Sequence, residues 1–138
     1  MVSFFVVDDD ITILKLYDKI LSLYGFEIIG CAQNGKEAVV KFKNFKVKPD
    51  FIIIDYHMPL KDGCKAAKEI LEIDATVKII ICSGDPSIKE KVLSMGVIDF
   101  IEKPFNLKTF QNKIINTYNN SIFLKLNTPN FHPSNYIT

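Results

Sequence analysis

Three consecutive aspartates, Asp8, Asp9 and Asp10, directly follow an apolar run near the start of the chain. Like-charged carboxylates about 4 Å apart repel one another by roughly 4 kcal/mol at an effective dielectric constant near 20. Such a cluster therefore needs a positive partner, and hard carboxylate oxygens around a small opening suit Mg²⁺. The alternative is that the aspartates only cap a following helix, for which one aspartate is sufficient.

Other polar side chains stand at or just after the ends of later apolar runs. Asp55 ends the run FIIID, Ser83 and Gly84 follow KIIIC, and Lys103 follows the apolar run 97–101. If these runs are parallel strands, their carboxyl ends share one edge of a sheet, where α/β proteins bind ligands. A crevice with carboxylates, a hydroxyl and an ammonium group suits phosphoryl transfer, because metal and ammonium neutralise the phosphoryl oxygens.

The elements that would position these residues alternate between strand and helix five times. The five apolar runs are mostly continuous, as in parallel strands buried on both faces. They are Ser3–Val7, Glu27–Ala32, Phe51–Asp55, Lys78–Ser83 and Val97–Ile101. This order predicts an α/β protein of the doubly wound (βα)5 type, with helices on both faces of the sheet.

Helical periodicity marks the segments between the strands and after the last one. Gly25 ends the first helix, Asn34 caps the second with Glu37 in a capping box, and Asp85 caps the fourth. The third runs from about Lys65 to Leu71. The apolar faces of the others are marked by Leu14, Tyr17, Leu21 and Tyr24, by Ala38, Phe42 and Phe45, by Ile88, Val92 and Met95, and by Leu107, Phe110, Ile114 and Tyr118.

The charge balance argues against several classes of function. Seventeen lysines and no arginine stand against sixteen acidic residues, which leaves a net charge of +1. This balance gives no reason to expect nucleic acid or a membrane as a direct partner, and arginine is the side chain best suited to read bases. In the Lys- and Phe-rich segment 41–48, helical spacing places phenylalanines on the core face and lysines in water, which we favour over nucleic-acid binding.

The length of 138 residues fits one domain. Apolar stretches are too short to cross a bilayer and no signal peptide is evident, so we expect a cytoplasmic protein. Cys31, Cys64 and Cys82 lack metal spacing and are expected to be reduced, with Cys31 and Cys82 acting as small hydrophobes inside strands. Turn signals from about Ser121 predict a domain at residues 1–120 and a tail or linker at 121–138.

Four motifs in order resemble those of the response-regulator receiver domain of two-component signalling, in particular chemotaxis regulators. They are VVDDD, FIIIDYHMPLKDG, ICSG and DFIEKPF, each at the end of a predicted strand. The resemblance covers about residues 1–120. It implies a flavodoxin-like fold with a parallel five-stranded sheet of order 2-1-3-4-5.

The resemblance also implies a set of site residues. Asp55 would accept a phosphoryl group, and Asp9 and Asp55 would bind Mg²⁺ directly, with Asp8 acting largely through water. The main-chain carbonyl of His57 would add a ligand, whereas the His57 ring is expected to be an exposed loop side chain rather than a ligand, since no second His or Cys lies near it in sequence.

The implied switch involves three further residues. Lys103 and Ser83 would contact the phosphoryl group, and Phe100 would turn inward once Ser83 has moved. The output surface would be the fourth helix, fifth strand and fifth helix. Simpler interpretations stay open: Lys103 as a surface lysine, Ser83 as a strand-end hydroxyl, and Phe100 as plain core. The resemblance also suggests a cis Lys103–Pro104 bond.

The implied function is a phosphorylation-controlled binding module, not a turnover enzyme, although it would assist its own phosphorylation and dephosphorylation. Its partners would be a histidine kinase or phosphotransfer protein and a downstream target protein, and it would be a monomer or a phosphorylation-dependent dimer. The alternatives are the receiver half of a longer DNA-binding transcription regulator, a receiver that never takes phosphate, and an aspartate-nucleophile phosphohydrolase. A haloacid-dehalogenase-like hydrolase expects an aspartate two residues after the nucleophile, where this chain has His57.

Overall fold

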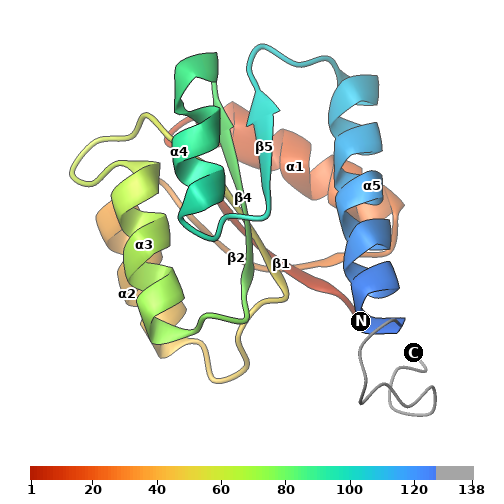
Figure 1. The fold of residues 1–138 in the computed structure, drawn as a ribbon, viewed down its shortest axis with the longest axis horizontal. Coiled ribbons are helices and arrows are strands. Elements are labelled where there is room, and N and C mark those ends of the chain that lie inside the picture. The colour runs from red at the N-terminus through yellow and green to blue at the C-terminus, as the bar shows by residue number, and fades with distance from the viewer. Residues whose placement is uncertain (127–138) are drawn as a thin grey trace. The chain divides into compact units, whose positions relative to one another are not determined.

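Five parallel strands form one sheet in the computed structural model, which describes residues 1–126. The strand order is β2-β1-β3-β4-β5, so the predicted order and fold class are confirmed (Figure 1). The strands are β1 (Ser3–Val7), β2 (Glu27–Ala32), β3 (Phe51–Asp55), β4 (Lys78–Ser83) and β5 (Asp99–Glu102). The first four have the predicted bounds. The fifth begins two residues later than predicted and ends at Glu102.

The helices are α1 (Ile11–Leu23), α2 (Gly35–Asn44), α3 (Gly63–Ile73), α4 (Lys89–Ser94) and α5 (Leu107–Leu126). The fourth predicted helix is in fact a 3₁₀ turn at Pro86–Ile88 followed by the short α4, and the Asp85 side chain caps the turn by accepting from Ser87 N. Regular structure was expected to lapse at about Ser121, and this was wrong, because α5 continues to Leu126. The predicted tail beyond residue 126 lies outside the described residues.

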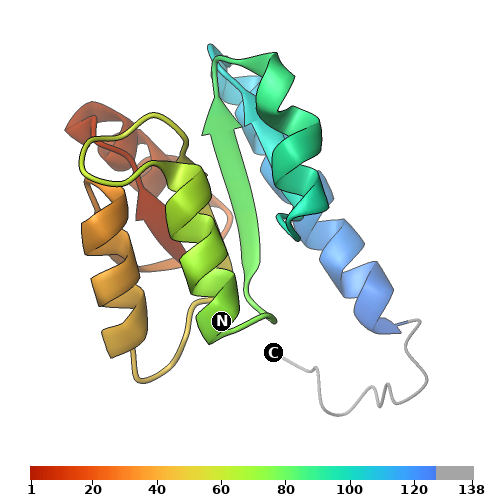
Figure 2. The same cartoon turned by 60° about the vertical axis from the view of Figure 1, so that its left-hand side comes forward.

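Residues 1–104 form one compact unit that holds the whole sheet and α1 to α4, and α5 belongs to a second unit. In the first unit, α1 covers one face of the sheet and α2, α3 and α4 cover the other (Figure 2). Strands β1, β3 and β4 are buried almost throughout, which explains their unbroken apolar sequences. Burial of each Ile, Val or Phe side chain of these strands contributes roughly 1.5–3 kcal/mol to the stability of the fold. The packed strands therefore hold the residues at their carboxyl ends in fixed positions.

Strand β2 lies at the edge of the sheet and is only partly buried. Both Cys31 and Cys82 lie inside strands and are free, as predicted, but only Cys82 on β4 is buried; Cys31 on β2 is exposed and does not act as a buried hydrophobe. The Lys41 ammonium donates to the main-chain carbonyl of Cys31 at 2.7 Å and pairs with Glu37 at 2.8 Å. An edge strand can carry the same apolar sequence as a central one, which is why the sequence pattern did not separate them.

The caps of α2 show how side chains fix its two ends. Asn34 Oδ1 accepts from Glu37 N at 2.8 Å as predicted, but the Glu37 carboxylate accepts from Gln33 N and not from Asn34 N. The lysines of segment 41–48 were expected to lie in water, but the Lys48 ammonium donates to the carbonyls of Phe42 and Lys43 in the last turn of α2 and of Phe45, its C-cap. Among residues 1–126, no helix is long and apolar enough to cross a membrane.

Candidate functional site

The three aspartates after β1 have separate tasks. Asp10 is exposed and caps α1, since its Oδ1 accepts from Thr12 N at 2.9 Å. Asp8 is 1% exposed, and its Oδ1 accepts from Asp10 N at 2.9 Å. Asp9 is exposed at the surface of the site. Helix capping therefore explains only Asp10, and the two other carboxylates are available for different chemistry.

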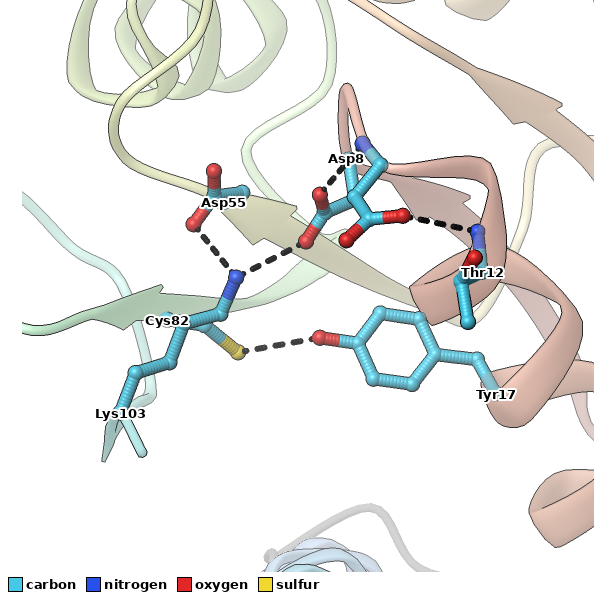
Figure 3. A network of polar contacts seen from close by, with 7 residues as sticks. Asp8, Thr12, Tyr17, Asp55, Cys82 and Lys103 are labelled. Atoms are coloured by element: carbon cyan, nitrogen blue, oxygen red, sulfur yellow. Dashed lines mark hydrogen bonds and ion pairs between the residues drawn. The ribbon is translucent and has the colours of Figure 1, made fainter. Parts of the chain in front are cut away.

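A lysine joins the ends of three strands. The Lys103 ammonium, which follows β5, donates to Asp8 Oδ2 and to Asp55 Oδ1, both at 2.9 Å (Figure 3). Its side chain is 25% exposed, and the two carboxylates are almost completely buried. Lys103 is thus not an ordinary surface lysine. The Lys103–Pro104 peptide bond is cis, as the resemblance implied.

The carboxylates of Asp8, Asp9 and Asp55 could share a metal ion. One oxygen from each lies within 4.8 Å of the others. Three carboxylates carry three negative charges and Lys103 carries one positive charge, so two negative charges are left over, which one divalent cation would balance. An all-oxygen set of this size fits Mg²⁺ completed by water.

Burial and charge act in opposite directions on the two central groups. Burial raises the pKa of Asp55 above its ordinary value, and hydrogen bonding to Lys103 only partly offsets this rise. Burial alone would lower the pKa of Lys103, but its contacts with Asp55 and Asp8 outweigh burial and raise that pKa. The ammonium therefore stays charged at neutral pH, while Asp55 takes up a proton more readily than a free aspartate.

Ser83 and Gly84 lie at the end of β4 beside this cluster. Ser83 is 1% exposed, its Oγ accepts from Asp85 N at 3.0 Å, and its carbonyl accepts from Lys103 N at 2.8 Å. A Cβ added to Gly84 would meet only the Lys103 carbonyl, at 3.6 Å. The sheet thus places Ser83 and Gly84 at the same edge as Asp55, as the sequence indicated.

The remaining predicted residues lie around the cluster. The His57 side chain is exposed, and its ring packs edge-on against Tyr56 with centroids 4.7 Å apart. Phe100 on β5 is 4% exposed and belongs to the core on the α2–α4 face, so its ring is already buried in this structure. The metal role of the His57 carbonyl and the switch role of Phe100 stay predictions.

Two contacts at the site were not anticipated. Gly63 begins α3, and a Cβ there would lie 2.2 Å from the Asp55 carbonyl oxygen, so the α3 backbone is pressed against the end of β3. The Tyr17 hydroxyl donates to Cys82 Sγ at 3.7 Å beneath Asp8 and Lys103 (Figure 3). Burial raises the pKa of both groups, that of Cys82 to about 12, so both are neutral at pH 7. The sequence offered one signal for the Tyr17 contact: a tyrosine on the core face of a helix places a hydroxyl in the core, where it needs a hydrogen-bond partner.

This fold and this site define a class of protein, the receivers of two-component signalling. The family model of the response regulator receiver domain matches residues 4–115, and the chain belongs to this family. Within it the chain is similar to chemotaxis proteins CheY. It is 40% identical over 102 residues to CheY of Thermotoga maritima, covering 72% of this chain and 83% of that protein. It is 39% identical over 116 residues to CheY of Bacillus subtilis, covering 83% and 95%.

A solved structure shows the same fold. The CheX–CheY complex with BeF3 and magnesium from Borrelia burgdorferi matches with a TM-score of 0.77 and 31% identity, covering 88% of this chain and 89% of that chain. The sequence-based assignment to a chemotaxis-regulator-like receiver is therefore confirmed.

Proposed function

We propose that Asp55 accepts a phosphoryl group from a histidine kinase or phosphotransfer protein and that this modification controls binding of a target protein. The observation that carries the proposal is the position of the Lys103 ammonium, 2.9 Å from both Asp8 and Asp55, beside three carboxylates that could hold one divalent cation. A nucleophilic carboxylate, a fixed cation and a metal site are the parts that phosphoryl transfer requires.

The residues of the chain would act as follows. An Asp55 oxygen attacks phosphorus in line with the leaving group, and the bond from phosphorus to the donor breaks as the acyl phosphate forms. Lys103 offers positive charge to the phosphoryl oxygens, and the Ser83 hydroxyl offers a hydrogen bond. Mg²⁺, held by Asp8, Asp9, Asp55 and the His57 carbonyl, would supply further positive charge when bound.

The new charge provides the proposed switch. A phosphoryl group adds nearly two negative charges and three acceptor oxygens, which compete with Asp8 for the Lys103 ammonium. The Lys103 N–H donates a main-chain hydrogen bond to the Ser83 carbonyl, so a movement of either residue shifts the other. Phe100 lies on β5, which pairs with β4, the strand that ends in Ser83, and the surface of α4 and β5 is part of the proposed output.

The comparisons support a protein that works through partners. The Borrelia burgdorferi relative was solved in complex with CheX, BeF3 and magnesium, so a protein partner and a metal-bound beryllofluoride state are expected for this chain as well. We propose a cytoplasmic signalling protein that assists only its own phosphorylation and dephosphorylation.

Intact-mass spectrometry after incubation with Mg²⁺ and acetyl phosphate tests the assignment. We expect wild type to gain the mass of one phosphoryl group, and Asp55→Asn and chelator-treated wild type to gain none. Asp10→Asn is the matched control, because asparagine also caps a helix and Asp10 is outside the carboxylate cluster. Unmodified wild type would contradict the proposal, and continuous turnover of p-nitrophenyl phosphate would favour a phosphohydrolase instead.

A further inference from the structure

The buried pair Tyr17 and Cys82 lies under the site but takes no part in the function proposed above. Tyr17 on α1 has 0% exposure, and its hydroxyl donates to Cys82 Sγ at 3.7 Å. Figure 3 shows the Tyr17 ring reaching from α1 toward Cys82, on the side of the site opposite Asp55 and its Lys103 contact. A phenylalanine would fill the same space without placing a hydroxyl in an apolar core, so packing alone does not explain the tyrosine.

Cys82 occupies a central position among the functional residues of the sheet. Its Cα is the register partner of Asp55 in the β3–β4 pairing, and its carbonyl accepts from Tyr56 N at 2.9 Å. The next residue, Ser83, accepts from Lys103 N through its own carbonyl. A shift of Cys82 would therefore move Ser83 and Lys103 relative to the phosphoacceptor carboxylate.

The start of the same helix is connected to the acidic cluster. Asp10 caps α1, and Asp8 accepts from the main-chain N–H of Asp10. Helix α1 is thus attached at its first turn to Asp8 and, almost two turns later, to the end of β4 through Tyr17. The electric fields of Asp8 and Asp55 act on both the Tyr17 hydroxyl and the Cys82 thiol, which places the pair next to the charged groups.

We propose that Tyr17 is a positioning residue for phosphorylation: by holding Cys82, it keeps the end of β4, and with it Ser83 and Lys103, in place beside Asp55. This inference rests on the proposed phosphoryl transfer to Asp55. It assigns Tyr17 no contact with the phosphoryl group or the metal. Loss of its hydroxyl should slow the chemical step and leave the metal ligands where they are.

The test compares Tyr17→Phe with wild type at saturating Mg²⁺ and acetyl phosphate, with the phosphorylated fraction followed by intact mass over time. We expect the rate constant to fall about three- to tenfold, because small misplacements around a reacting centre are costly. The Mg²⁺ dissociation constant, measured by calorimetry, should change less than about twofold, since all three carboxylates remain.

Control variants separate positioning from general loss of stability. Ile20→Val removes one methylene from a buried position on the same helix and should leave the rate constant unchanged. Cys82→Ala should match Tyr17→Phe, the double variant should be no slower than either, and Cys82→Ser, which keeps a hydrogen-bonding group, should recover most of the rate. Urea unfolding gives the free energy of unfolding of each variant, against which its loss of rate is compared.

The outcomes distinguish this inference from the function on which it rests. If wild type is phosphorylated and Tyr17→Phe matches Ile20→Val in rate, the positioning role is overturned and the proposed function stands. The role is also overturned if Tyr17→Phe loses rate only in proportion to Mg²⁺ affinity. If wild type takes up no phosphoryl group, the proposed function fails, and this inference fails with it.

Discussion

Neutralising Asp9 tests whether the clustered carboxylates repel one another in the folded protein. Asp9 is the exposed member of the cluster, and one of its oxygens lies within 4.8 Å of an oxygen of Asp8 and of Asp55. At that distance each pair repels by about 3.5 kcal/mol at a dielectric constant of 20 and by about 1 kcal/mol in water. Because Asp9 faces water, the lower value applies to each of its two pairs, and attraction to Lys103 cancels part of the sum.

In chelator-containing buffer we therefore expect Asp9→Asn to be more stable than wild type by about 1 kcal/mol, which corresponds to about 3 to 5 °C in melting temperature. Magnesium should reverse this order. A ligand present at a hundred times its dissociation constant stabilises the fold that binds it by about 2.7 kcal/mol. Wild type should gain this amount, and Asp9→Asn, which lacks one ligand, should gain much less.

The assay is urea unfolding, followed by far-ultraviolet circular dichroism, of wild type, Asp9→Asn and Asp10→Asn with chelator and with excess Mg²⁺. Asp10→Asn keeps its helix cap and should behave like wild type in both buffers. The reasoning is refuted if Asp9→Asn is less stable than wild type in chelator, or if both proteins gain equally from Mg²⁺.

Three further changes test other parts of the site. Burial raises the pKa of Asp55, so the folded state binds the proton more tightly than the unfolded state, and wild type loses stability as pH rises above the ordinary aspartate range. In chelator, the free energy of unfolding of Asp55→Asn relative to wild type should therefore increase between pH 4 and pH 7 in urea titrations. A difference that does not change with pH would contradict this. Gly63→Ala should lower the free energy of unfolding by roughly 2 kcal/mol or more, because the new Cβ would meet the Asp55 carbonyl oxygen at 2.2 Å. Gly84→Ala, where the added Cβ has space, should leave the free energy of unfolding nearly unchanged. Equal effects of the two substitutions would refute the packing argument. Leu60 is 79% exposed and has a φ of 68°, a left-handed backbone conformation that is unfavourable for residues other than glycine. Leu60→Gly should therefore raise the free energy of unfolding by about 1 kcal/mol in the same assay. A loss of stability would show that the backbone at residue 60 is not strained.

The sheet was predictable because its central strands have a distinctive composition. The runs that became β1, β3 and β4 are continuous and apolar, and caps such as Asn34 and Asp85 fix where the neighbouring elements begin. The errors arose where local sequence does not encode the environment. Cys31 has the neighbours of a buried residue but lies on an edge strand, and α5 continues through a stretch with few helix signals.

The site was predictable to the level of which strand ends meet. Parallel strands bring Asp8, Asp55 and Lys103 to one edge of the sheet, and the order of the strands was implied by the family resemblance. The double hydrogen bond of Lys103 joins residues 95 and 48 positions apart, and no local pattern specifies such a distance. The Tyr17 bond to Cys82 was missed for the same reason, since helical periodicity identifies Tyr17 only as a core position.

The contact between the Lys41 ammonium and the Cys31 carbonyl has a consequence for self-association. An open strand edge is a template on which a second molecule can add its own strand, and a lysine laid across it occupies a carbonyl that such a strand would use. Continuation of the sheet from β2 into a neighbouring molecule would require this lysine to leave both the carbonyl and Glu37. If phosphorylation produces a dimer, its contacts should therefore form away from β2.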